Sequence, residues 1–313
     1  MSKQVPSGDH SEPWTVLRLI QWTTSYLTGK GVKRARFDAE VLLADLLELS
    51  RVKLYLNYDR PLNQPELKAF RERVRRRADF EPVAYITGHK EFYSLELKVD
   101  RGVLIPRPET ELLVDETLKA AQNQLSDHEA EIGSLHIVDL GTGCGAIALA
   151  LASRLSQARI WAIDLSEKAV EIARANAKRH GLESRITFLQ GDLLEPLRDR
   201  TDYFHLIAAN LPYVPRIAFD DMAPDVKDFE PRLALNGGED GLDLITKAVA
   251  QARALLRLQG ALLLEIWHTH APAVREMGRT CGYNQVRICK DLAGRDRVAV
   301  LIKNNPGGSV SHG

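Results

Sequence analysis

The spacing of hydrophobic positions divides the chain into an all-helical first part and an alternating second part. Over residues 14–80, apolar side chains recur at intervals of three and four, as at Ala39, Leu42, Leu43 and Leu46. This is the period of amphipathic helices, and glycines and prolines separate the apolar groups. The pattern predicts a small helical domain over residues 14–80.

Residues 81–106 have a different period. Leu95, Leu97 and Val99 alternate with charged side chains, which is typical of a half-buried strand. We therefore expect a β-hairpin that links the two parts of the chain. A helix is expected to begin near Pro108, because proline suits the first helical position, and the polar residues 122–134 are expected to form a loop.

From Leu135 onward, short apolar runs alternate with helical stretches. Strands are expected at residues 135–140, 160–164, 186–190, 204–209, 261–266, 286–289 and 298–302, and helices at residues 146–155, 166–180, 242–258 and 271–281. This alternation predicts an α/β domain over residues 107–303, with a mainly parallel sheet covered on both faces. Such sheets bind ligands at the carboxyl ends of their strands.

Residues 210–240 interrupt the alternation, with four prolines and no helical period. A long irregular segment at this place in an α/β domain is usually functional. The two polar ends of the chain, residues 1–13 and 304–313, are expected to be disordered tails.

Composition narrows the class of protein. The 313 residues suffice for about two domains. Forty-two lysines and arginines balance forty-two aspartates and glutamates, which argues against a nucleic-acid coat or a membrane-surface protein. No apolar run is long enough to span a bilayer, and the first residues lack the apolar core of a secretory signal. The three scattered cysteines, Cys144, Cys281 and Cys289, predict neither a disulfide framework nor a metal site, so we expect a cytoplasmic protein.

A predicted helix over residues 66–78 is rich in basic side chains. They are Lys68, Arg71, Arg73, Arg75, Arg76 and Arg77. One interpretation is a solvated helix face, and the other is a docking face for an acidic or nucleic-acid-bearing partner. The sequence leaves both open.

A glycine-rich loop follows the first strand of the second part. Its residues are Gly141, Thr142, Gly143, Cys144 and Gly145, and glycine lets the backbone turn sharply and approach a ligand closely. Asp164 ends the next strand, where a carboxylate can accept both hydroxyls of a ribose. We expect this loop and Asp164 to bind a nucleoside cofactor, although the loop also fits a dinucleotide fingerprint.

Two further acids favour S-adenosylmethionine over NAD. Asp139 leads into the loop, where it can meet the cationic methionine end of the cofactor, whereas a pyrophosphate would be repelled. Asp192 follows the strand at residues 186–190 and can accept a hydrogen bond from an adenine amino group. Cys144 is expected to be a small turn residue without thiol chemistry.

The segment Asn210-Leu211-Pro212-Tyr213 directly follows the strand at residues 204–209. An amide nitrogen is a poor nucleophile because its lone pair is delocalised. The Asn210 side-chain oxygen and the Leu211 carbonyl can each accept one N–H of such a nitrogen, which orients it and favours positive charge on it. Tyr213 offers a flat face for the planar group. We expect Asn210 and Tyr213 to be catalytic and all four residues to bind the substrate.

These motifs, with three further stretches, resemble the HemK-like (PrmC) release-factor glutamine methyltransferases from about residue 15 to residue 303. The three stretches are residues 82–111, residues 230–242 and residues 291–298. The resemblance implies a seven-stranded Rossmann-like methyltransferase domain and methyl transfer from S-adenosylmethionine to the glutamine of a Gly-Gly-Gln segment in peptide-chain release factors.

The resemblance also assigns parts of the chain. It implies that the helical domain helps to hold the release factor. By matching positions, it implies that the cofactor is contacted by the glycine loop and by Asp164, Asp192, Leu193 and Asn210. It also implies that residues 210–213 hold the glutamine. No membrane and no direct nucleic-acid substrate are expected.

The sequence departs from this family at two places. Leu211 stands where the family motif has its first proline, but Pro212 still biases Leu211 towards an extended backbone. We therefore expect only the Leu211 carbonyl to matter. Trp267 and His270 stand where the family usually has glycine and glutamine, and His268 and His270 lack a third ligand for a metal.

Four alternative interpretations remain. The first is methylation of a glutamine in a ribosomal protein, which residues 107–111 disfavour. The second is adenine-N6 methylation of a flipped base in a nucleic acid, which would need a basic channel. The third is an inactive adaptor with the same fold, and the fourth is an NAD-dependent enzyme, in which Asn210 would have no task.

Overall fold

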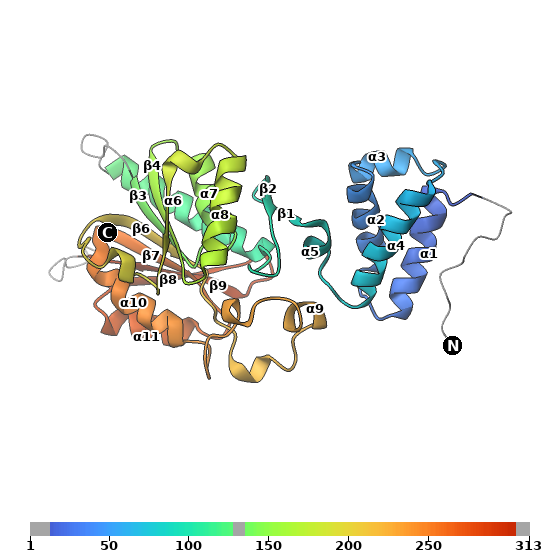
Figure 1. Ribbon diagram of the computed structural model, residues 1–313. Helices are drawn as coiled ribbons and strands as arrows, with labels where there is room; N and C mark the ends of the chain where they lie inside the picture. Colours follow the sequence, from blue (N-terminus) through green and yellow to red (C-terminus); the bar gives the residue numbers. More distant parts are fainter. Residues whose placement is uncertain (1–12, 128–134, 305–313) are drawn as a thin grey trace. The chain divides into compact units, whose positions relative to one another are not determined.

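The computed structural model describes residues 13–127 and 135–304 and folds them into two compact units (Figure 1). The helical unit contains residues 13–88 together with Pro224–Phe229, and the sheet unit contains the other described residues. The two expected tails lie outside the described residues, apart from Pro13 and Asn304.

The first part of the chain is helical, as predicted. Its helices are α1 (Val16–Gly29), α2 (Ala35–Leu46), α3 (Arg51–Leu56), α4 (Gln64–Ala78) and α5 (Val83–Thr87), and the unit also includes α9 (Pro224–Lys227). Helix α4 begins with a capping box, in which Asn63 and Glu66 each bond to the backbone N–H of the other. Ile20, Leu42 and Phe70 lie in a continuous apolar core, which explains the helical spacing of the apolar residues.

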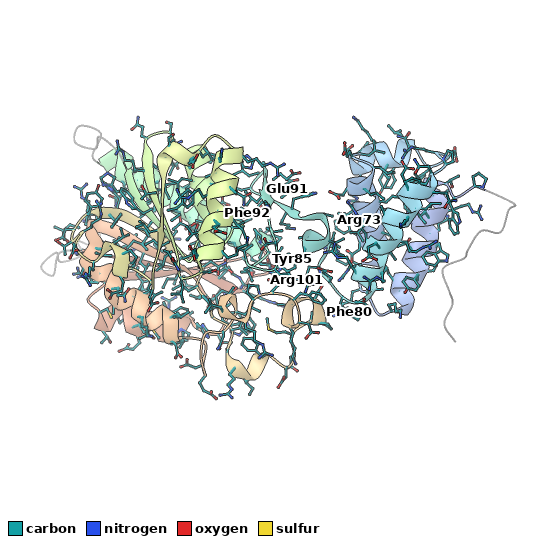
Figure 2. All side chains as sticks on the ribbon, viewed as in Figure 1. Arg73, Phe80, Tyr85, Glu91, Phe92 and Arg101 are labelled. Atoms are coloured by element: carbon teal, nitrogen blue, oxygen red, sulfur yellow. The ribbon has the colours of Figure 1, made fainter. Side chains whose placement is uncertain are left out.

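The basic side chains of α4 are largely committed to partners within the helical unit. Arg73 pairs with Asp45 of α2 (Arg73 is labelled in Figure 2). Arg77 is buried against Asp38, with 2.7 Å between Nε and Oδ2. A buried pair of this kind is costly to break, because it leaves one charge without compensation. Arg75 and Arg76 pair with Glu72 and Glu81, so the basic helix cross-links its own domain, and Lys68 and Arg71 are exposed.

The expected hairpin lies within the sheet unit. Strands β1 (His89–Phe92) and β2 (Leu95–Lys98) pair antiparallel, and Tyr93 and Ser94 between them both have positive φ. Two positive φ values match the tight turn that suits the twist of a hairpin. The preceding residues, expected to belong to the linker, instead form α5 of the helical unit.

In the described residues, the sheet unit forms a seven-stranded sheet in the order β5-β4-β3-β6-β7-β9-β8. The strands are β3 (Leu135–Leu140), β4 (Ala158–Asp164), β5 (Ile186–Gln190), β6 (Phe204–Ala209), β7 (Leu256–Glu265), β8 (Gln285–Lys290) and β9 (Asp296–Ile302). The helices are α6 (Glu111–Asp127), α7 (Ala146–Arg154), α8 (Glu167–Arg179), α10 (Asp243–Leu255) and α11 (Ala271–Thr280), with single 3-10 turns η1 (Pro108–Thr110), η2 (Glu183–Arg185), η3 (Glu195–Leu197), η4 (Arg216–Ala218) and η5 (Arg232–Ala234). Strands β3 to β7 are parallel and β9 is antiparallel to both neighbours, so the predicted α/β architecture is confirmed.

Several element boundaries differ from the sequence prediction, and two of the larger differences concern the helices α6 and α10. Helix α6 continues through residues 122–127, which were expected to be a loop, because one face of this helix buries Leu113, Val114 and Ala121 and its polar residues need only occupy the other face. The rest of that expected loop, residues 128–134, lies outside the described residues. Helix α10 ends at Leu255, since Leu256 begins β7 instead of continuing the helix to residue 258.

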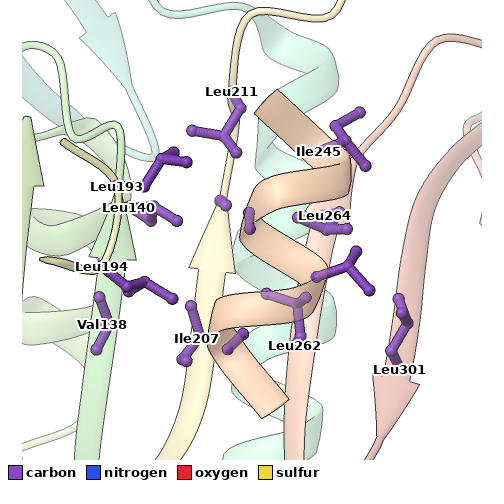
Figure 3. Packing of buried hydrophobic residues seen from close by; sticks show 14 of the residues in the cluster. Val138, Leu140, Leu193, Leu194, Ile207, Leu211, Ile245, Leu262, Leu264 and Leu301 are labelled. Atoms are coloured by element: carbon purple, nitrogen blue, oxygen red, sulfur yellow. The ribbon is translucent and has the colours of Figure 1, made fainter. Parts of the chain in front are cut away.

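The sheet positions its side chains alternately on two covered faces. Val138 and Leu140 of β3 pack into one apolar cluster with Ile245 of α10 and Leu262 of β7 (Figure 3). Side chains alternate along a strand, so Asp139 lies on the opposite face, towards α7. Among the described residues, no helix is long and apolar enough to cross a membrane.

Candidate functional site

A cavity of about 190 Å³ lies at the carboxyl ends of the parallel strands, where the sequence predicted ligand binding. Its lining includes most of the predicted cofactor and substrate residues, namely Gly141, Thr142, Gly143, Cys144, Asp164, Asp192, Leu193, Asn210, Leu211 and Pro212. It also includes residues that the motifs did not single out, among them Thr110, Ile147 and Leu244. Two predicted site residues, Gly145 and Tyr213, are not part of this lining.

The glycines of the loop have different tasks. Gly141, Gly143 and Gly145 all have positive φ, a region that side chains with a Cβ rarely adopt. A Cβ on Gly145 would lie 2.4 Å from Leu149 and 3.2 Å from Ala173, so Gly145 lets α7 pack closely against α8. A Cβ on Gly143 would meet no atom within 4 Å, so the backbone there leaves open space beside the cavity.

Asp164 holds the glycine loop from the end of β4. Its Oδ2 accepts a hydrogen bond from Gly143 N at 2.9 Å, and its Oδ1 accepts one from Ser166 N at 2.9 Å. Burial raises the pKa of Asp164, against the opposing effect of these backbone donors. Each carboxylate oxygen has a further lone pair, so Asp164 can brace the loop and still accept from a ligand in the cavity.

Asp139 lies beneath the loop and not at the cavity surface, so the expectation that it meets the cofactor directly is not supported. The Asp139 side chain is fully buried, and its Oδ2 accepts from Thr142 Oγ1 at 2.6 Å and from Ala148 N at 2.9 Å. Its Oδ1 has no hydrogen-bond partner among the described residues. Burial raises the pKa of Asp139 to about 7, because a carboxylate without full compensation is disfavoured in an apolar interior.

Asn176 of α8 joins the hairpin to the glycine loop. Its Nδ2 donates to the carbonyls of Lys98 and Cys144, and its Oδ1 accepts from Lys98 N at 2.8 Å. Cys144 itself is buried, and burial raises the pKa of its thiol to about 12. The thiol is therefore un-ionised at neutral pH, in agreement with the absence of thiol chemistry expected from the sequence.

The pairing of β3 with β6 brings the glycine loop and the Asn210 segment together. Leu140 lies opposite Ala209 in this parallel pair, so the two segments leave the sheet side by side. A Cβ on Gly141 would lie 3.2 Å from Leu211 Cδ2, and Leu211 is buried in the apolar cluster just beyond β6 (Figure 3). The sequence assigned a role only to the Leu211 carbonyl, and the structure adds that the Leu211 side chain packs against the loop.

Tyr213 is not part of the cavity lining, and its side chain reaches the end of β7. Its hydroxyl donates to Glu265 Oε1 at 2.7 Å, and its ring lies 6.1 Å from that of Trp267 between centroids. Burial raises the pKa of Tyr213 well above its usual range, and the nearby Glu265 carboxyl adds to the effect. The hydrogen bond to Glu265 holds the Tyr213 end of the segment in place.

The glycines of residues 236–241 pack closely against the backbone of Tyr213. Val214 N donates to Leu235 O, and Gly237 N donates to Val214 O. A Cβ on Gly241 would lie 2.3 Å from Tyr213 O, and one on Gly237 would lie 2.8 Å from Tyr213 Cα. Only residues without a Cβ allow this close approach, which explains why the stretch is rich in glycine.

His270 supports the same stretch, because its Nε2 bonds to Asp240 O at 3.0 Å. In the parts of the chain that the structure describes, no group of three or more His, Cys, Asp and Glu side chains is arranged to hold a metal ion.

Comparison with known proteins gives the same division of the chain. The profile of the PrmC N-terminal domain matches residues 18–88, and that of a methyltransferase domain matches residues 137–228. A release factor glutamine methyltransferase from Rhodopirellula baltica is 38% identical over 93% of this chain and 97% of its own length. The chain belongs to the release factor glutamine methyltransferase family.

A second relative agrees with this assignment. The release factor glutamine methyltransferase of Geobacter sulfurreducens is 40% identical over 92% of this chain and 96% of its own length. Among solved structures, the hMettl16 catalytic domain shares the fold, with a TM-score of 0.53 and 14% identity over 79% of this chain and 84% of that chain.

Within this family member, the structure gives contacts to residues for which the sequence motifs assigned no role. Thr110 accepts a hydrogen bond from Asn210 Nδ2 at 3.1 Å, and Glu265 holds Tyr213. Arg107 pairs with the buried Glu230, which ties the segment before α6 to the long loop. Glu265 could have been found, because a charged residue directly after the apolar residues 261–264 of β7 is as unusual as Asp164 at the end of β4.

We expect Gly241→Ala to lower methyl-transfer activity about 10-fold or more, because its Cβ would displace the Tyr213 carbonyl and with it the Asn210 segment. The matched control is Gly181→Ala, since Gly181 also has positive φ but an added Cβ there meets nothing within 4 Å. Backbone strain should lower the free energy of unfolding of both variants by about 1 kcal/mol, and Gly241→Ala should lose more because its Cβ also clashes with the Tyr213 carbonyl. Equal activity of the two variants would contradict the role assigned to Gly241.

The buried Asp139 predicts a pH-dependent stability. Its pKa is near 4 in an unfolded chain and about 7 in the folded one, so the unfolded state releases the proton first and folding becomes less favourable as pH rises between these values. Asp139→Asn mimics the protonated form. Between pH 5 and pH 7.5, the free energy of unfolding of the variant should rise by up to about 3 kcal/mol relative to that of the unmodified protein, as measured by urea unfolding at both pH values. A difference that does not change with pH would refute the raised pKa.

Proposed function

We propose that this chain transfers a methyl group from S-adenosylmethionine to the side-chain nitrogen of the glutamine in the Gly-Gly-Gln segment of peptide-chain release factors. The observation that carries the proposal is the position of Asn210, which lines the cavity directly beside the glycine loop. Membership of the release factor glutamine methyltransferase family, with relatives that match almost the whole chain, supports the choice of substrate.

The cavity fits a nucleoside with a flexible charged tail. Open space lies beside Gly143. The carboxylates of Asp164 and Asp192 supply polar groups for a ribose and an adenine. Leu193 and Ile147 supply apolar walls for a flat base. S-adenosylmethionine would contribute an electrophilic methyl group on a sulfonium ion.

Asn210 and Leu211 would prepare the glutamine nitrogen for reaction. The Asn210 Oδ1 and the Leu211 carbonyl each accept one N–H, which holds the nitrogen in place and stabilises the positive charge that develops on it. The buried Leu211 side chain fixes the position of that carbonyl against Gly141. No strong base is required, because a methylated cationic amide nitrogen loses its proton to water.

The helical unit is proposed to recognise the release factor, in a protein that acts in the cytoplasm. The match of residues 18–88 to the PrmC N-terminal domain supports a separate module with its own task. The arginines of α4 that pair within the unit are poor candidates for contact residues, and the exposed Lys68 and Arg71 are better ones.

The function is tested with labelled S-adenosylmethionine, a purified release factor, a ribosomal protein and an adenine-containing duplex in one reaction. We expect label in the release factor, and mass spectrometry should place it on the glutamine of the Gly-Gly-Gln segment. Asn210→Ala should lower kcat by about 10²–10³-fold, as for loss of one preorganised polar contact, and Asn210→Asp should retain part of the activity. Label in the ribosomal protein or in the duplex alone would overturn the proposal.

Removal of residues 1–88 tests the role of the helical unit. All the lining residues named for the cofactor lie in the sheet unit, so calorimetry should detect nearly unchanged affinity for S-adenosylmethionine. The kcat/KM for an intact release factor should fall by about 100-fold, equivalent to about 3 kcal/mol of binding energy. If the truncated protein binds the cofactor and methylates the release factor at the full rate, the helical unit does not recognise the release factor.

A further inference from the structure

The position of residues 236–241 sets the position of the Tyr213 carbonyl. An added Cβ would lie 2.8 Å from Tyr213 Cα at Gly237 and 2.3 Å from Tyr213 O at Gly241. A backbone hydrogen bond joins the same two segments, since Gly237 N donates to Val214 O at 3.1 Å. Because no side chain separates the two backbones, any shift of residues 236–241 is passed directly to Tyr213.

The imidazole ring of His270 borders the same side of Gly241. The added Cβ on Gly241 that would meet the Tyr213 carbonyl would also lie 2.9 Å from His270 Cε1 and 3.2 Å from His270 Nε2. The ring and the carbonyl therefore enclose the Cα of Gly241 between them. His270 is 5% exposed, so its ring is part of the packed interior and not a surface group.

A hydrogen bond ties this ring to the glycine-rich stretch. His270 Nε2 lies 3.0 Å from Asp240 O. A carbonyl oxygen can only accept, so this partner assigns the proton of the neutral ring to Nε2. Nδ1 has no hydrogen-bond partner among the described residues. Burial lowers the pKa of His270, against the opposing effect of Asp240, so the ring is neutral at pH 7 and Nε2 is its one donor.

The backbone of His270 is fixed by its place at the start of α11. His270 is the N-cap residue of this helix, and its carbonyl accepts from Val274 N at 3.0 Å. Its own N–H donates to Trp267 O at 2.9 Å, which closes a turn after β7. Val274 is fully buried in the apolar cluster of the sheet. The ring of His270 therefore reaches Gly241 from a rigid part of the sheet unit.

The connection from β7 to α11 thus holds Tyr213 at two places. Glu265 accepts the Tyr213 hydroxyl at 2.7 Å, and His270 acts on the Tyr213 carbonyl through Gly241. Tyr213 ends the four-residue segment that Asn210 begins. A shift of the Tyr213 carbonyl therefore moves the two acceptors of this segment out of line with a target nitrogen.

We propose that His270 is a positioning residue, which holds residues 236–241 against Tyr213 and so keeps the acceptors of Asn210 and Leu211 in place. The proposal rests on the function assigned to Asn210 above. It also accounts for a departure from the family pattern. Glutamine, which the family usually has in place of His270, carries amide N–H groups that can donate to the same carbonyl, so the two residues should be interchangeable here.

Kinetic tests compare two substitutions of His270. His270→Leu removes the donor and keeps a side chain of similar size, so kcat should fall by about 10- to 100-fold. His270→Gln restores an N–H donor and should recover most of the rate. Calorimetry should give unchanged affinity for S-adenosylmethionine in both variants, because neither His270 nor Gly241 lines the cavity. His270→Ala supplies the same comparison if His270→Leu does not fold.

Tyr283→Phe is the matched control for a loss of stability alone. Tyr283 is also buried, and its hydroxyl donates to Val249 O at 3.0 Å in the same unit. Tyr283→Phe and His270→Leu each remove one buried donor to a backbone carbonyl, but only His270 contacts the stretch at Tyr213. We expect Tyr283→Phe to keep the full kcat. An equal kcat in these two variants, or a His270→Gln variant as slow as His270→Leu, would overturn the proposal.

Hydrogen exchange tests the proposal without methyl transfer. The Gly237 amide donates to Val214 O, so its exchange rate reports whether residues 236–241 stay in contact with the segment. We expect this amide to exchange about 10-fold faster in His270→Leu and at the unmodified rate in His270→Gln and Tyr283→Phe. Equal exchange in all four proteins would refute the proposal even if the release factor is methylated. Faster exchange in His270→Leu alone would support it even if the release factor is not the substrate.

Discussion

The site depends on one constraint, which is the parallel pairing of β3 with β6 at the centre of the sheet. Leu140 opposite Ala209 places the glycine loop and the Asn210 segment at the same edge, and Gly141 then packs against Leu211. Strands in this register bring the glycine loop and the Asn210 segment into contact through one side chain, that of Leu211. The neighbouring strands add Asp164 at the end of β4 and Glu265 at the end of β7, so each of these buried strands delivers one polar group to the same edge.

Polar groups beneath the cavity are fixed by a small number of buried contacts. Asp139 ties Thr142 to the start of α7, and Asn176 ties the loop to the hairpin. Glu265 does the same for Tyr213 on the other side of the segment. Each group is costly to bury and is useful only when its partners are in place. This arrangement favours a site that is rigid before any ligand arrives, as electrostatic catalysis requires.

Much of this arrangement could be predicted from the sequence because it follows from local patterns. An apolar run that ends in an acid or an asparagine marks the carboxyl end of a buried strand, and this rule located Asp164 and Asn210. Contacts between distant parts of the chain could not be predicted in this way. The partners of Arg73 and Arg77, Asp45 and Asp38, lie in another helix, so the sequence alone left the basic helix open to two interpretations.

The direction of side chains was the other limit. Tyr213 was expected to face the substrate. Its hydroxyl donates a hydrogen bond to Glu265, which lies 52 positions further along the chain. The importance of the Leu211 side chain was missed because the neighbour that it packs against, Gly141, becomes adjacent only when β3 pairs with β6. The helical conformation of residues 122–127 was missed because their polar side chains suggested a loop, whereas these residues continue helix α6.

The central claim is that Asn210 and Leu211 hold the target nitrogen through two accepted hydrogen bonds. A crystal structure of the protein with the demethylated cofactor and a release factor would test it most directly. The account predicts the nitrogen of the Gly-Gly-Gln glutamine at about 2.7–3.2 Å from both Asn210 Oδ1 and the Leu211 carbonyl oxygen, with Asn210 Nδ2 on Thr110. A glutamine nitrogen bound away from Asn210, or an Asn210 amide turned with Nδ2 towards the substrate, would contradict it.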